Sequence, residues 1–257
     1  MQPLKHALVN TGDIVSQFCA LLTLSTLFPG LARCFTPVFT YFDGTGDYCA
    51  TTEAISDTDG PLGTVSMLYT PQEDGAASGV RALFRSNDGL DFRLDHNAGD
   101  LIFFRLQNAA GTNILRFTST STYTVADGPL HILISWNQDA SPTHTFKVNG
   151  VDAGHTVLNN IQGDADYSSN GVIGILGTAV GGSLNDCCLS ELYINTVAEI
   201  TDATLFANGN QGINLGAQGE LPSGSQPKWY IPNLLTGTNL GSLSNLTVNG
   251  DPQTGCP

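Results

Sequence analysis

Residues 128–152 read GPLHILISWNQDASPTHTFKVNGVD and form the most complete hairpin pattern in the chain. From Leu130 to Trp136 nearly every position is apolar, as expected for a strand packed between two layers. After a polar break, residues 145–149 alternate between polar and apolar side chains, and Asn149-Gly150 tolerates the left-handed conformation of a tight turn. We therefore predict two antiparallel strands followed by another turn.

The composition extends this pattern to the whole chain. It has 257 residues, 41% of them hydrophobic, 12% charged and 29 of them glycine. Many glycines and few charges are typical of short strands joined by tight turns, whereas helices need more Glu, Lys, Ala and Leu. We predict an all-β protein with one main domain.

The net charge of the chain limits the kinds of partner that it can bind. The chain has nine basic and 23 acidic residues, which gives a net charge of -14. The arginines are separated in sequence, at positions 33, 81, 85, 93, 105 and 116. No run of basic residues suits phosphate contacts, so we predict neither nucleic acid nor an anionic membrane as a partner.

The cysteines lie at positions 19, 34, 49, 187, 188 and 256. Their irregular spacing fits neither a disulfide framework nor a zinc site. We predict ordinary reduced or buried thiols, with one or two bridged pairs as the alternative.

Residues 1–36 differ from the rest. Ile14 to Leu31 form an apolar run that must be weighed as a signal peptide or membrane anchor, but serines, threonines and Pro29 dilute it. Asp13 can cap a helix that Pro29-Gly30 would end. We predict an amphipathic N-terminal arm that docks on a neighbour, or alternatively packs across its own domain.

Residues 37–257 continue the strand pattern. Turn signals separate GTVSMLYT, GVRALFRS, LDFRLDH and LIFFRLQN, and later NILRFTSTSTYTV, HTVLNN, VIGILGTA and CLSELYIN. We predict roughly a dozen strands between Tyr41 and Asn195, enough for two packed sheets. From about residue 196 the pattern loosens, with a short helix over 203–208 capped by Asp202, and we predict a tail that wraps the sandwich.

Two sets of residues carry a family resemblance. The run from Phe42-Asp43-Gly44 through HILISWN to TFKVNGV resembles the concanavalin A-like, laminin-G-like jelly rolls. The tail, with residues 189–194, Asn214-Leu215-Gly216, residues 237–241 and residues 246–250, is similar to laminin-G-like virion proteins of tailed bacteriophages. Residues 203–212 depart from that group, where an arginine-rich helix start is expected. The resemblance implies a jelly roll carried on the virion.

The acidic residues argue against an enzyme. Glycosidases of this fold carry Glu-x-Asp-x-x-Glu on one strand, which places nucleophile and acid on either side of the scissile bond. The glutamates stand at 53, 73, 191, 199 and 220, and none is followed by Asp two residues later. Glu191 alone lies in a strong strand pattern, where a structural pairing is the favoured interpretation. We predict no catalytic residue.

Two clusters could supply oxygen ligands for calcium. They are Asn87, Asp88, Asp91, Asp95 and Asn97, and the pair Asp43 and Asp47. Neither follows the alternating calcium-loop pattern, and Asn-Asp-Gly is more simply a turn. We predict no cofactor, with calcium as the alternative.

Aromatic residues in loop-like stretches are the candidates for stacking on sugars. Trp229, Tyr230 and Tyr167 are predicted glycan contacts, the alternative being that the tail aromatics pin the tail to the sandwich.

The sequence therefore favours a non-enzymatic structural protein on the virion surface of a tailed phage, a capsid decoration or fibre component anchored by its arm. Its partners would be other virion proteins and sister subunits. The alternative is a carbohydrate-binding module for host surface glycans, on a tail fibre or secreted.

Overall fold

The computed structural model describes residues 37–51, 53–74, 80–86, 92–168, 173–176, 186–209 and 211–257. The predicted arm, residues 1–36, lies outside them. The described residues form strands, loops and two short 3-10 helices, η3 (Val125–Asp127) and η4 (Ala203–Leu205). The predicted all-β architecture is confirmed.

The first sheet has eight strands. Their order is β10 (Val151–Asp152), β9 (Thr143–Val148), β8 (Leu130–Asn137), β3 (Leu62–Pro71), β13 (Asp186–Asn195), β1 (Thr40–Asp43) and β18 (Gln253–Thr254), with β16 (Trp229–Ile231) paired to β13. All neighbours are antiparallel.

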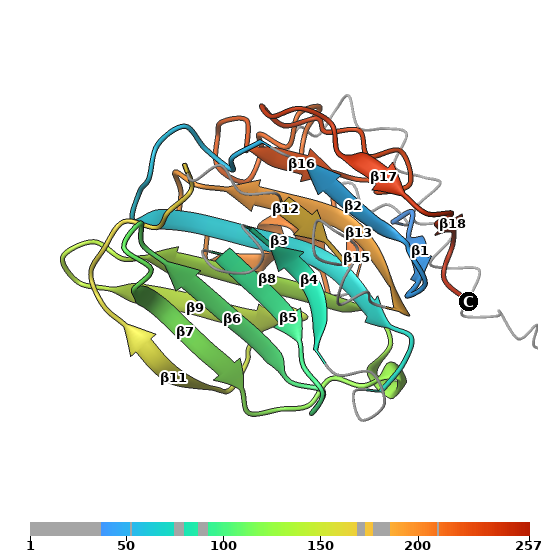
Figure 1. Ribbon diagram of the computed structural model, residues 1–257, viewed down its shortest axis with the longest axis horizontal. Helices are drawn as coiled ribbons and strands as arrows, with labels where there is room; N and C mark the ends of the chain where they lie inside the picture. Colours follow the sequence, from blue (N-terminus) through green and yellow to red (C-terminus); the bar gives the residue numbers. More distant parts are fainter. Residues whose placement is uncertain are drawn as a thin grey trace, which may run out of the picture.

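The second sheet also has eight antiparallel strands. Their order is β11 (His155–Asn160), β7 (Asn113–Ser119), β6 (Ile102–Gln107), β5 (Phe92–His96), β4 (Arg81–Arg85), β12 (Ile173–Ile175), β2 (Tyr48–Thr51) and β17 (Thr247–Asn249). Figure 1 shows β7, β6, β5 and β4 side by side. A separate small hairpin joins β14 (Ala207–Asn208) to β15 (Gln211–Gly212).

The predicted hairpin is β8 paired with β9. Ile132 lies opposite Val148 and Asn137 opposite Thr143. Asn149 and Gly150 have φ values of 52° and 81°, the left-handed turn that leads into β10.

Trp136 of β8 packs in the core between the two sheets. Its indole Nε1 donates to the Tyr167 hydroxyl at 2.8 Å, and that hydroxyl donates to the Leu62 carbonyl at 2.7 Å. The indole lies so close to Gly63 that a Cβ there would be 2.2 Å from a ring carbon. Only glycine fits opposite this ring.

The tail covers the other face of the first sheet. Leu133 and Tyr193 point away from the main core into a second buried cluster, with Ile200, Phe206, Ile213 and Leu215 from the tail. This covering layer is why β8 is apolar on both faces.

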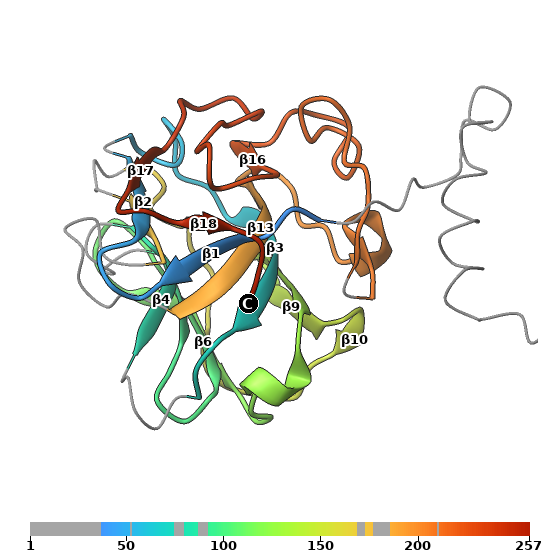
Figure 2. The same cartoon turned by 90° about the vertical axis from the view of Figure 1, so that its right-hand side faces the viewer.

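The tail also adds strands to both sheets. β16 pairs with β13, β17 with β2 and β18 with β1, and Figure 2 shows this orange and red segment crossing the top of the molecule. The helix expected over 203–208 is shorter, because η4 ends at Leu205 and β14 starts at Ala207; Asp202 caps it, as predicted, through Thr204 N.

A disulfide ties the end of the tail to the first sheet. Cys188 of β13 is bonded to Cys256, while Cys49 and Cys187 are free and buried. The prediction of six thiols is therefore wrong for Cys188 and Cys256. β18 pairs with β1 and β1 with β13, which brings a cysteine 68 residues away in sequence next to Cys188.

Candidate functional site

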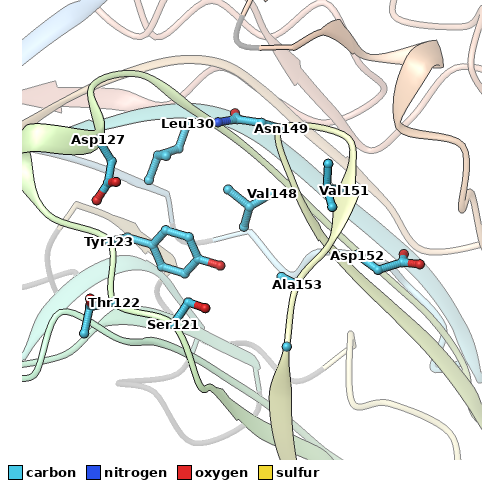
Figure 3. A pocket seen from close by; sticks show the side chains of 11 residues that line it. Ser121, Thr122, Tyr123, Asp127, Leu130, Val148, Asn149, Val151, Asp152 and Ala153 are labelled. Atoms are coloured by element: carbon cyan, nitrogen blue, oxygen red, sulfur yellow. The ribbon is translucent and has the colours of Figure 1, made fainter.

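A hollow of about 380 Å³ lies between the segment after β7 and the β9–β10 hairpin. Its walls are Ser121, Thr122, Tyr123, Asp127, Leu130, Val148, Asn149, Val151, Asp152, Ala153 and Gly154. Figure 3 shows the Tyr123 ring extending from its loop toward the strand segment that carries Val148 to Ala153. The hollow therefore has apolar side chains around an aromatic ring, with polar groups beside them.

Local contacts hold the wall that carries Tyr123. The Tyr123 backbone N–H donates to the Asp100 carbonyl at 2.7 Å, and the side chain is 8% exposed. Asp127 accepts from the backbone N–H of Thr124 at 2.7 Å, the capping box of η3. Burial, and next the charge of Asp127, raise the pKa of the Tyr123 hydroxyl. Tyr123 is thus a neutral side chain held in place by its loop.

The opposite wall is the β9–β10 turn. Asn149 Oδ1 accepts from the His131 backbone N–H at 2.7 Å, which ties the turn to β8. Asp152 is 3.8 Å from the Lys147 ammonium, and Val151 is 70% exposed at the rim. The arrangement can receive a small amphipathic ligand that has one apolar face and several hydroxyl groups.

Sequence reasoning missed this hollow. It assigned residues 113–125 to one strand, whereas β7 ends at Ser119 and Tyr123 lies in the following loop. The Ser- and Thr-rich run STSTYT was the available signal, since such residues favour turns over strand interiors.

The three predicted glycan contacts lie inside the protein. Trp229, Tyr167 and Tyr230 are 0%, 1% and 5% exposed. Trp229 packs edge-on to Phe84, and Tyr230 belongs to the cluster beneath the tail. Because stacking on a sugar needs an open ring face, the prediction is corrected: Trp229 and Tyr230 pin the tail, and Tyr167 supports Trp136.

The predicted calcium ligands have other partners. Asp95 accepts from Arg85 at 2.9 Å and from Arg93, and Asn97 Oδ1 closes its own turn by accepting from Gly99 N. Asn87, Asp88 and Asp91 lie outside the described residues.

The second calcium candidate is engaged in turns as well. Asp43 accepts from Thr45 N at 2.7 Å, and Asp47 accepts from Asp251 N at 2.7 Å. Within the parts of the chain that the structure describes, no group of three or more His, Cys, Asp or Glu side chains could hold a metal ion.

Glu191 is a buried acid in a β-bulge. Its φ is 54°, and the β13–β3 register shifts between Ser190 and Tyr193. The residue is 5% exposed, and neither carboxylate oxygen has a hydrogen-bond partner among the described residues. Burial raises its pKa to about 8, although the nearby Tyr230 hydroxyl favours the charged form. Glu191 therefore lies beneath the tail beside the Tyr230 hydroxyl.

The register of the second sheet gathers arginines that are far apart in sequence. Arg85 lies opposite Arg93, Arg93 opposite Arg105, and Arg105 opposite Arg116, in one line across β4, β5, β6 and β7. We call these four residues the arginine row. The arginines stand singly in the sequence, but antiparallel pairing places residues 8 to 12 positions apart side by side.

The described residues include no helix long and apolar enough to cross a membrane.

The fold has known structural counterparts. The native heptameric SAP-like pentraxin from Limulus polyphemus superposes with a TM-score of 0.54 at 15% identity, over 85% of this chain and 94% of that one. The receptor binding domain of botulinum neurotoxin C/D mosaic serotype matches over 64% of this chain and 41% of that one, at 14% identity and a TM-score of 0.42. No protein-family model and no curated protein sequence matches.

These observations define the class of protein. The chain is an all-β protein with the concanavalin A-like jelly-roll fold, as its sequence resemblance predicted.

Proposed function

We propose that this chain is a non-enzymatic glycan-binding module exposed on the virion surface of a tailed phage. The observation that carries the binding role is the hollow between the Tyr123 loop and the β9–β10 hairpin. The virion setting is supported by the resemblance of the tail, from residue 189 onward, to laminin-G-like phage proteins.

The chemistry of the hollow suits a sugar. A pyranose has an apolar C–H face and a rim of hydroxyls, so it needs apolar side chains and nearby polar groups together. The accessible side chains of Val148 and Val151 provide the first above the buried Tyr123 ring, and Asn149 and Asp152 provide the second. The volume of about 380 Å³ is that of a site for one or two sugar residues.

A variant that obstructs the rim tests this role. Val151 is 70% exposed, so Val151→Arg places a long side chain at the hollow without disturbing the core. Val197→Arg is the matched control, because Val197 is 62% exposed and does not line the hollow. On a glycan array, saturable binding by the full chain should fall about tenfold or more in the first variant only. Equal binding by both variants would contradict the proposal.

A second role, a structural capsid decoration or fibre component, is favoured by the edge strand β11. Residues 156–158 are all exposed, with Val157 at 42% and Leu158 at 54%, and Ile161 beyond them is 45% exposed. Proteins usually protect such an edge, so an apolar one suits a sister subunit or another virion protein.

Removing the N-terminal arm, residues 1–36, tests this second role. Deleting residues 1–36 should leave a folded, soluble domain that no longer joins the particle. Particles that still incorporate the truncated chain would rule out anchoring by the arm.

A further inference from the structure

The arginine row stands on the outer face of the second sheet. Along β6, Ile102, Phe104 and Leu106 are fully buried in the core, while Phe103, Arg105 and Gln107 between them are half-buried on the other face. Arg93, Arg105 and Arg116 share this outer face because they are direct cross-strand partners. With neighbouring strands about 4.8 Å apart, four residues in line span about 14 Å.

This face is positive on an acidic protein. The chain has nine basic residues against 23 acidic ones, and four of the nine stand in this row. Strands β4 to β7 contain a single acidic residue, Asp95, which accepts from both Arg85 and Arg93. Asp88 and Asp91, between Arg85 and Arg93 in sequence, lie outside the described residues. The positive charge is therefore concentrated on this face.

Phe103 organises two of the arginines. The Arg93 and Arg116 guanidinium carbons lie 5.2 and 5.5 Å from the centroid of its ring. Arg93 comes from β5, Arg116 from β7, and Phe103 from β6 between them. A guanidinium held against an aromatic ring loses little freedom when it binds, so the two groups are preorganised.

The Nε of Arg116 is buried and makes no hydrogen bond among the described residues. Its guanidinium carbon lies over the Phe103 ring, 5.5 Å from the centroid, and the two terminal nitrogens carry the N–H groups that can reach a ligand. The planar N–H fork of arginine matches carboxylate and sulfate oxygens through two parallel hydrogen bonds.

We infer that Arg93 and Arg116, on either side of the strand that carries Phe103, bind the carboxylate or sulfate group of an acidic glycan. Thr118 lies directly opposite Phe103, and Thr156 opposite Thr118, so neutral hydroxyls continue the site toward β11. They are suited to hydrogen-bond the sugar hydroxyls beside the anionic group.

A glycan fits this face better than a nucleic acid. Single-stranded nucleic acid needs open aromatic rings for base stacking, and Phe103 is already in contact with two guanidiniums. A long phosphate chain also requires many cationic contacts, whereas the remainder of this protein is strongly acidic.

The inference is independent of the hollow, and Arg116 provides its test. Arg116→Gln removes the guanidinium without breaking a hydrogen bond of the described structure, so the variant should fold, as circular dichroism will show. Lys228→Gln, which removes one positive charge from the tail, is the matched control. Arg116→Lys keeps the positive charge but removes the planar set of guanidinium N–H donors.

The full chain is titrated by calorimetry with polygalacturonate, dextran sulfate and neutral dextran at fixed ionic strength. We expect binding to one or both acidic polymers and none to dextran. Arg116→Gln should weaken it about ten- to hundredfold, Arg116→Lys less, and Lys228→Gln less than about twofold. The Val151→Arg variant of the hollow should bind the acidic polymer like the parent.

Three results would overturn the inference. The first is no binding to either acidic polymer, and the second is equal weakening by Arg116→Gln and Lys228→Gln. The third is binding of a single-stranded oligothymidylate that is as tight as binding of the acidic polymers and that disappears in Arg116→Gln. That result would show that the site binds phosphate.

Discussion

Replacing Glu191 with glutamine should make the protein more stable at neutral and alkaline pH. The side chain is 5% exposed beneath the tail, and its carboxylate oxygens have no hydrogen-bond partner among the described residues. Burial raises its pKa from 4.5 to about 8. At about 1.4 kcal/mol for each pKa unit, ionising this group in the folded state costs about 5 kcal/mol.

The sign of the pH dependence follows from the raised pKa. Below pH 4.5 the carboxyl is protonated in the folded and the unfolded chain and carries no penalty. As the pH rises toward 8, the unfolded chain ionises while the folded chain stays neutral, so the free energy of unfolding falls by up to about 1.4 kcal/mol per pH unit. Above about pH 8 both states are ionised, and the penalty is constant.

Urea denaturation from pH 5 to pH 9 measures this effect. His96 and His131, whose pKa values burial lowers to about 4, oppose the trend at acidic pH, but they are present in both proteins and cancel in the difference. The gap between Glu191→Gln and the parent should widen with pH and level off near pH 8. The surface change Glu199→Gln is the control. A gap that does not depend on pH would refute the assigned pKa.

Two further predictions concern packing and the disulfide. Gly63→Ala should lower the free energy of unfolding by about 3 kcal/mol or more, because the added methyl collides with Trp136. In the control Gly99→Ala the methyl meets only ordinary contacts, so the free energy of unfolding should change by less than about 0.5 kcal/mol. Thermal denaturation compares the two variants, and an equal loss of stability in both would contradict the close contact between Gly63 and the Trp136 ring. Replacing Cys188 and Cys256 together by serine should cost about 4 kcal/mol, since the bridge closes a loop of 68 residues. A urea midpoint unchanged in that variant would show that the bridge does not constrain the unfolded chain.

The local pattern of the sequence predicted much of the fold. The nearly continuous apolar run of residues 130–136, the alternation of residues 145–149 and Asn149-Gly150 after them predicted β8, β9 and the turn into β10. A strand places successive side chains on opposite faces, so a strand covered on both faces is apolar throughout and a half-exposed one alternates. Similar patterns predicted the strands that became β3 to β6.

The candidate sites were predicted less well. Trp229 and Tyr230 stood in a loop-like stretch, and only the pairing of β16 with β13 buries them. Tyr123 was assigned to a strand, and the hollow exists because the β9–β10 hairpin faces its loop.

The sequence by itself determined the strand-rich architecture, the main turns and the acidic charge, since these depend on residues close together in the chain. Only the tertiary structure decided the arginine row, the Cys188–Cys256 bond and the hollow beside Tyr123. These depend on register and strand order, which are set by how the sheets pack. A shift of one residue in register moves every side chain of a strand to the opposite face.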